Sequence, residues 1–154
     1  MKIIVFIFTV LSLSVLTHNV NAQINNHYDS VLAKKLKADD YGMKTYTLII
    51  LKQGTANITD KKVLDSIFHG HMANIKRLAS ESKLLLAGPM GDNDKMYEGI
   101  FVFNTADVNE AKQWLSTDPA IQSKDLDAEL YQWYGPAALQ EVISINEKLQ
   151  KKSF

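Results

Sequence analysis

A histidine and several carboxylates lie close together in the chain, in types and spacing that could transfer protons. His71 begins the segment HMANIKRLASESKLLLAGP (residues 71–89), and the loop that follows contains Asp92 and Asp94. An imidazole changes its charge near neutral pH, and a neighbouring carboxylate can orient the ring and stabilise its cation. Asp118, which precedes a proline, is a third aspartate that could meet the histidine. Only one of the three is needed for such a pair.

A helix predicted over residues 61–81 must position this histidine. Thr59 or Asp60 can cap its first turn. Apolar residues recur at i, i+3, i+4 and i+7, so they share one face that we expect to be buried. A histidine on that face is either a core residue satisfied by backbone or water, or a proton shuttle tuned by a carboxylate. The predicted face consists of Leu64, Ile67, Phe68, His71, Ile75 and Leu78.

His69 cannot share a site with His71, although only one residue separates them. On a helix the two side chains point about 200° apart. A pair of histidines in this spacing would suggest a metal site on a strand, but it does not on a helix. We therefore predict no metal site.

Asp118 and Pro119 are expected to end a second helix, over residues 108–116, because the residue before a proline avoids the helical region. Asp118 would then lie at a helix C-terminus, where a carboxylate faces the helix dipole unfavourably. Alternatively, Asp118 has only a structural role, as a residue that forms a turn. Asp92 and Asp94 lie in a glycine-containing loop and could equally be solvated turn carboxylates.

Four short apolar runs predict strands. With the two helices between them, the order is β-α-β-β-α-β, which is the ferredoxin-like arrangement of an α+β protein. Tyr131 and Trp133 alternate with Leu130 on the last strand, so both faces of the sheet are apolar. We expect a homodimer to bury the second face. The predicted strands span residues 46–51, 83–87, 99–103 and 128–134.

The first 22 residues have the pattern of a secretory signal peptide. Lys2 precedes an apolar run over residues 3–16, and Val20-Asn21-Ala22 fits the small-x-small cleavage rule. At 1.5 Å per residue the run spans about 21 Å as a helix, short of the ~30 Å of a bilayer core. This favours a cleaved signal over a membrane anchor. We expect cleavage before Gln23 and an exported protein, either periplasmic or secreted.

The composition excludes several classes of function. Cleavage would remove Lys2 from a chain with 17 basic and 17 acidic residues, which leaves a net charge of −1. Such a chain has no basic field for nucleic acid or an anionic membrane. Arg77 is the only arginine. Cysteine is absent, which excludes disulfides, thiolate metal sites and a cysteine nucleophile.

The order of motifs resembles the YCII-related (YciI-like) family. HMANIKRLASESKLLLAGPM is followed by an acidic loop, a glycine-led strand, a helix ending in STDPA and a closing strand. The resemblance covers about residues 44–135 and implies a ferredoxin-like fold of the dimeric α/β-barrel type. An N-terminal extension over residues 23–43, with a helix at 28–38, and a C-terminal helix at 137–150 within residues 136–154 lie outside it.

The resemblance also implies a cleft centred on a histidine and an aspartate. His71 takes the histidine position. Asp94 best fits the loop aspartate, with Asp92 as the alternative, and Asp118 takes the position before the proline. Ser82 stands where the family favours glycine as a left-handed helix stop.

Two functions are compatible with these features. The first is a cofactor-independent enzyme of isomerase or lyase type, in which His71 moves a proton next to a carbonyl of a small organic ligand and an aspartate orients the imidazole. The alternative is a non-catalytic dimer that binds a small molecule or an envelope partner through the sheet cleft. The expected partners are an unknown small molecule and a second copy of the chain, with no nucleic acid and no membrane after signal cleavage.

Overall fold

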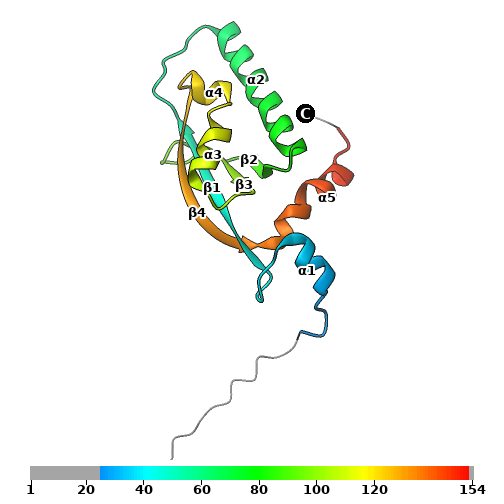
Figure 1. Ribbon diagram of the computed structural model, residues 1–154. Coiled ribbons are helices and arrows are strands. Elements are labelled where there is room, and N and C mark those ends of the chain that lie inside the picture. Colours follow the sequence, from blue (N-terminus) through cyan, green and yellow to red (C-terminus); the bar gives the residue numbers. More distant parts are fainter. Residues whose placement is uncertain (1–24, 153–154) are drawn as a thin grey trace, which may run out of the picture.

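The computed structural model describes residues 25–152, which form one antiparallel sheet with helices around it (Figure 1). The predicted signal peptide, residues 1–22, lies outside the described residues. Within residues 25–152, none of the helices combines the length and the apolar character that crossing a membrane requires. The elements in chain order are α1 (Ser30–Leu36), β1 (Met43–Gln53), α2 (Lys61–Ser80), β2 (Leu84–Pro89), β3 (Tyr97–Phe103), α3 (Val108–Leu115), α4 (Pro119–Gln122), β4 (Leu126–Pro136), the 3-10 helix η1 (Ala137–Glu141) and α5 (Val142–Leu149).

The sheet has the strand order β2-β3-β1-β4, and each neighbouring pair is antiparallel. β1 lies in the middle, so that Thr47 is opposite Phe103 of β3 on one side and Gln132 of β4 on the other. With α2 after β1 and α3 after β3, this is the ferredoxin-like topology. The predicted fold class is confirmed.

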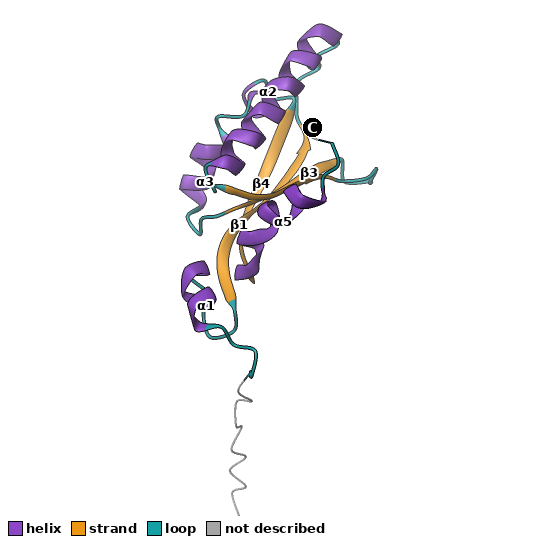
Figure 2. Ribbon diagram, turned by 90° about the vertical axis from the view of Figure 1, so that its right-hand side faces the viewer, coloured by secondary structure: helices purple, strands orange, loops and turns teal. Residues whose placement is uncertain are grey.

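One face of the sheet packs against α2 and α3, and Figure 2 shows these helices on one side of the sheet and α5 on the other. Side chains alternate between the two faces of a strand, so every second residue of β1 and β3 points toward these helices. Three aromatic rings are central to this core: Phe101 and Phe103 are stacked 6.0 Å apart, and Trp114 contacts Phe103. The buried cluster is Ile49, Leu51, Leu78, Leu84, Phe101, Phe103, Ala111 and Leu115.

The opposite face is covered at one end by the chain's own C-terminal segment. Leu139 of η1 packs against a second buried cluster that includes Tyr46 and Val102, and Trp133 lies 6.1 Å from the Tyr46 ring. Tyr131, on the same face, stays 51% exposed. We expected a second copy of the chain to bury this face. At the end that η1 covers, the chain's own C-terminal segment buries it instead.

The C-terminal segment also differs from the single helix predicted over residues 137–150. It is a 3-10 helix followed by the shorter α5. The side-chain amide of Gln140 donates to the carbonyls of Leu36 and Ala137. These bonds connect the start of the segment to α1 and satisfy a carbonyl that an uninterrupted α-helix would have paired within its own backbone.

The N-terminal extension is connected to this end of the sheet by polar contacts. Lys35 of α1 forms an ion pair with Glu141 at 2.8 Å, and Leu36 is the buried residue of the helix. Asp39 accepts a hydrogen bond from the Tyr134 hydroxyl of β4, which raises the pKa of Tyr134 to about 12.

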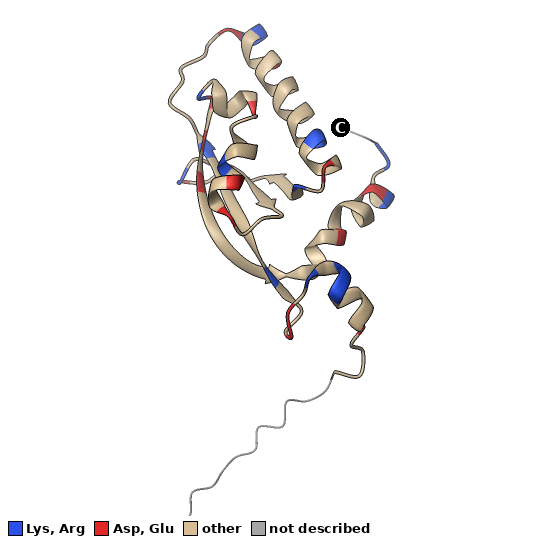
Figure 3. Ribbon diagram, in the orientation of Figure 1, with Lys and Arg blue, Asp and Glu red and all other residues tan. Residues whose placement is uncertain are grey.

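Acidic and basic residues are interspersed over the elements rather than separated onto two sides (Figure 3).

Helix α2 follows its predicted limits, but its buried face is narrower than predicted. Asp60 caps the first turn, and after the helix Ser82 adopts a left-handed φ of 56°, as expected for the family's glycine position. Phe68, predicted to be buried, is 60% exposed. The helix contacts the sheet and α4 through the strip that includes His71 and Leu78, and Phe68 lies beside that strip. The apolar residues of α2 therefore cover a wider part of its surface than the part that packs against the rest of the protein.

Candidate functional site

The structure brings His71 together with Asp118. The Nδ1 atom of His71 lies 2.8 Å from Oδ2 of Asp118, and the two residues are 47 positions apart in the chain. The side chain of His71 is 14% exposed, while that of Asp118 is 1% exposed. The His71 ring stacks on Phe101 of β3 at 5.9 Å. The other predicted partners, Asp92 and Asp94, are exposed in the loop between β2 and β3.

Asp118 occupies a helix start, which corrects the prediction that it lies at a helix C-terminus. Helix α3 ends at Leu115, and Asp118 is the N-cap of the short helix α4, with Pro119 as its first residue. Its Oδ1 accepts a hydrogen bond from the backbone N–H of Ala120 at 2.9 Å. An aspartate followed by a proline is a known helix-start pattern, so this signal was present in the sequence.

Two further residues at the site were missed by the sequence analysis. Asn74, one turn after His71 on α2, is 7% exposed, and its Nδ2 lies 3.5 Å from Oδ2 of Asp118. Arg77 donates from Nη2 to the side-chain oxygens of Asn74 and Thr117, both at 2.8 Å. The available signal was the spacing, because residues three apart on a helix are neighbours on its surface.

The geometry determines which nitrogen of His71 can react. A carboxylate only accepts hydrogen bonds, so Nδ1 carries a proton that it donates to Asp118, and the neutral ring has its lone pair on Nε2. Among the described residues, every buried side-chain nitrogen and oxygen has a hydrogen-bond partner. The bond to Asp118 occupies Nδ1, which leaves Nε2 as the ring nitrogen available to a ligand. The site can therefore accept and return a proton at Nε2.

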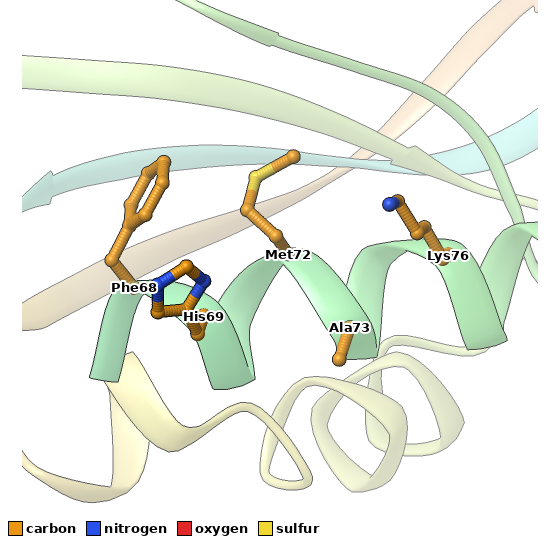
Figure 4. A pocket seen from close by; sticks show the side chains of 5 residues that line it. All are labelled: Phe68, His69, Met72, Ala73 and Lys76. Carbon is orange, nitrogen blue, oxygen red and sulfur yellow. The ribbon is translucent and has the colours of Figure 1, made fainter. Parts of the chain in front are cut away.

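His69 lies away from this pair, as its helical position predicts. It lines a hollow of about 350 Å³ on α2 together with Phe68, Met72, Ala73 and Lys76 (Figure 4). Phe68, Met72 and Lys76 extend from the same side of the helix, one turn apart (Figure 4). Within residues 25–152, no three side chains of the metal-binding types come together.

The chain is similar to a known domain family and, by fold alone, to solved structures. The model of the YCII-related domain matches residues 43–133. A solved 5-chloro-2-hydroxyhydroquinone dehydrochlorinase from Burkholderia phenoliruptrix AC1100, in complex with 2,5-dihydroxybenzoquinone, is 16% identical, with 56% of this chain and 92% of that chain covered and a TM-score of 0.42. The search of curated proteins found no match. The family match spans more than half of the sequence and includes both His71 and Asp118. The chain therefore belongs to the YCII-related domain family.

Proposed function

We propose that this protein is a cofactor-independent enzyme that transfers a proton on a small organic ligand. The observation that supports this most strongly is the hydrogen bond between His71 Nδ1 and the fully buried carboxylate of Asp118. A surface carboxylate would leave the imidazole free to turn, whereas a buried one holds a single tautomer in place. This is the arrangement that a general base requires, because the base must present its lone pair in a fixed direction.

In the proposed reaction, Nε2 of His71 removes a proton from a carbon next to a carbonyl. The electron pair of the broken C–H bond moves toward the carbonyl oxygen and gives an enolate, and His71 becomes an imidazolium. Asp118 stabilises this cation through the Nδ1 proton that it already accepts. Return of the proton to another atom completes an isomerisation, and departure of a group from the neighbouring carbon completes an elimination.

Asp118 is assigned the orienting role rather than that of the base. Both of its oxygens already accept hydrogen bonds, one from Ala120 and the other from His71, and the residue is buried. A ligand proton could reach it only after these bonds had broken. His71 keeps one nitrogen for the ligand, while its ring is held between Asp118 and Phe101.

The test is hydrogen–deuterium exchange of carbon acids. Pyruvate and dihydroxyacetone, as the first members of a panel of small ketones and 2-oxo acids, are incubated in D₂O with the protein and followed by NMR. We expect at least one compound of the panel to lose its α-protons about tenfold faster or more than in buffer, since general base catalysis commonly contributes 10² or more. His71→Gln, which cannot act as a base, should return the rate to that of buffer.

Lys95→Gln in the exposed β2–β3 loop serves as the control and should exchange like the wild type. If the wild type does not accelerate exchange of any panel member, or if His71→Gln keeps the acceleration, the proton-transfer proposal is wrong. A protein that binds panel compounds without exchanging their protons would support the alternative, a non-catalytic small-molecule binding protein.

We further propose that the protein acts as an exported homodimer. Beyond the cluster that the C-terminal segment covers, the same face of the sheet carries Ile50, Ile100 and Tyr131, and Tyr131 is half exposed. Apolar surface of this kind on a sheet favours association with a second copy. Export is supported by the signal-peptide pattern of residues 1–22.

One measurement tests both parts of this proposal. Native mass spectrometry of the protein from the cell envelope or the medium should give twice the mass of residues 23–154, with Gln23 as the first residue. A chain that still begins at Met1 would contradict cleavage. A monomer at micromolar concentration would contradict the dimer, and would mean that the chain's own terminal segments are sufficient to protect the sheet.

A further inference from the structure

We propose that Asn74 and Arg77 are positioning residues that hold Asp118 against His71. The inference rests on the proposed function, because the positioning affects catalysis only if the His71–Asp118 pair transfers protons. Asn74 contacts Asp118, Arg77 contacts the turn beside it, and neither residue is assigned a direct contact with the ligand.

The pair joins two separate elements, so its geometry depends on what fixes them to each other. His71 lies on α2, while Asp118 lies in the turn between α3 and α4. Arg77, also on α2, donates from Nη2 to the Thr117 hydroxyl at 2.8 Å, and Thr117 immediately precedes Asp118. The same Nη2 donates to Oδ1 of Asn74 at 2.8 Å. Arg77 therefore ties the turn that carries the carboxylate to the helix that carries the imidazole.

Arg77 also determines which way the Asn74 amide faces. A guanidinium is a donor only, so the amide oxygen must point toward Arg77 and the NH₂ group toward Asp118. At 3.5 Å the contact from Nδ2 to Asp118 Oδ2 is a long hydrogen bond. Its importance is that a donor rather than an acceptor lies beside the oxygen that binds His71. A reversed amide would place two oxygens against each other.

Close packing between α2 and the turn supports the same arrangement. A Cβ atom added at Gly70 would lie 2.8 Å from Cγ of Pro119, the residue after Asp118. Gly70, Asn74 and Arg77 are spaced by four and three residues, so they share one side of α2. That side faces the turn, which is held by contact at Gly70 and by hydrogen bonds at Arg77.

The outer nitrogen of Arg77 provides a matched control. Nη1 binds Glu81 at 2.8 Å on the exposed side of the helix, away from the site. Removing Glu81 breaks that ion pair but leaves the bonds from Nη2 to Asn74 and Thr117. The forked shape of arginine allows both sets of contacts, which a single ammonium group could not make in the same geometry.

The experiment measures how fast the Nδ1 proton of His71 exchanges with water, by NMR of the ¹⁵N-labelled full chain without ligand. In Arg77→Met, which keeps the aliphatic stem, we expect exchange about tenfold faster or more, the ratio that corresponds to the loss of one hydrogen bond from a charged group. Glu81→Gln should exchange at the wild-type rate. The backbone N–H of Ile49, in the sheet core, reports global opening and should be unchanged in both variants.

An unchanged rate in Arg77→Met would overturn the proposal. So would equal acceleration in Glu81→Gln, or equal acceleration of the Ile49 N–H, because either would assign the effect to the surface ion pair or to general loss of stability. The readout involves no substrate. A wild type that fails to exchange carbon acids would therefore refute the proposed function without affecting this result, and the reverse also holds.

Discussion

Asp118→Ala is expected to lower the free energy of unfolding by about 2–4 kcal/mol, of which the lost helix cap supplies about 1 and the unpaired polar groups the rest. The substitution removes the acceptor for the Ala120 N–H at the start of α4. It also leaves the Nδ1–H of His71 and the NH₂ group of Asn74 without their partner in a buried place. Urea denaturation of the two proteins gives the difference directly.

Asp118→Asn separates the structural part of this role from the chemical part. An asparagine keeps an oxygen that can accept from Ala120, so it should cost less stability than alanine. Its NH₂ group would then face Nδ1 of His71, which must accept rather than donate, and the ring proton moves to Nε2. Because His71 then lacks its reactive lone pair, the rate of carbon-acid exchange should fall at least about tenfold, toward the rate in buffer.

Asp118→Ala should mainly lose stability, and Asp118→Asn should mainly lose the exchange rate. If Asp118→Ala unfolds at the same urea concentration as the wild type, the carboxylate does not support the turn as described. If Asp118→Asn keeps the full exchange rate, Asp118 does not set the tautomer of His71, and the proposed mechanism fails even if His71 is the base.

Phe103→Ala is expected to cost about 3–5 kcal/mol, the range for removing a buried aromatic side chain. Phe103 has no exposed surface and contacts both Phe101 and Trp114, so its loss opens a cavity between the sheet and the helices. The matched control is Phe68→Ala, which removes the same side chain from an exposed position on α2. It should change stability by no more than about 0.5 kcal/mol.

Thermal and urea unfolding of both variants check this prediction. Equal losses in the two variants would mean that the Phe68 side chain is covered in solution, for example by a second copy of the chain. In that case the loss in Phe68→Ala should depend on protein concentration, because dissociation contributes to the unfolding equilibrium.

The amino-acid sequence alone determined the order of the four strands and of the two long helices between them, with their approximate limits. Short apolar strands and helices with an apolar repeat near 3.6 leave few arrangements that bury both, and β-α-β-β-α-β is one of them. The position of His71 on the inner face of α2 could also be predicted, because it follows from its spacing to Leu64, Ile75 and Leu78. These are local properties, which depend on residues a few positions apart.

The tertiary structure decided which carboxylate meets that histidine. Asp92 and Asp94 are closer to His71 in the chain than Asp118 is, but they lie in a loop beyond the end of β2. Asp118 reaches the site because α3 packs on the same face of the sheet as α2, and its exact place depends on the new helix start at Pro119. Such a contact between distant segments leaves no periodic trace in a single sequence.

The same reason explains the exposure of Phe68 and the roles of Asn74 and Arg77. A helical repeat shows which residues share a side of α2, but not how wide a strip the sheet and the α3–α4 turn will cover. Packing placed Phe68 just outside that strip and the polar Asn74 inside it. Asn74 is tolerated there because Arg77, Thr117 and Asp118 satisfy its amide, and only the folded chain brings these groups together.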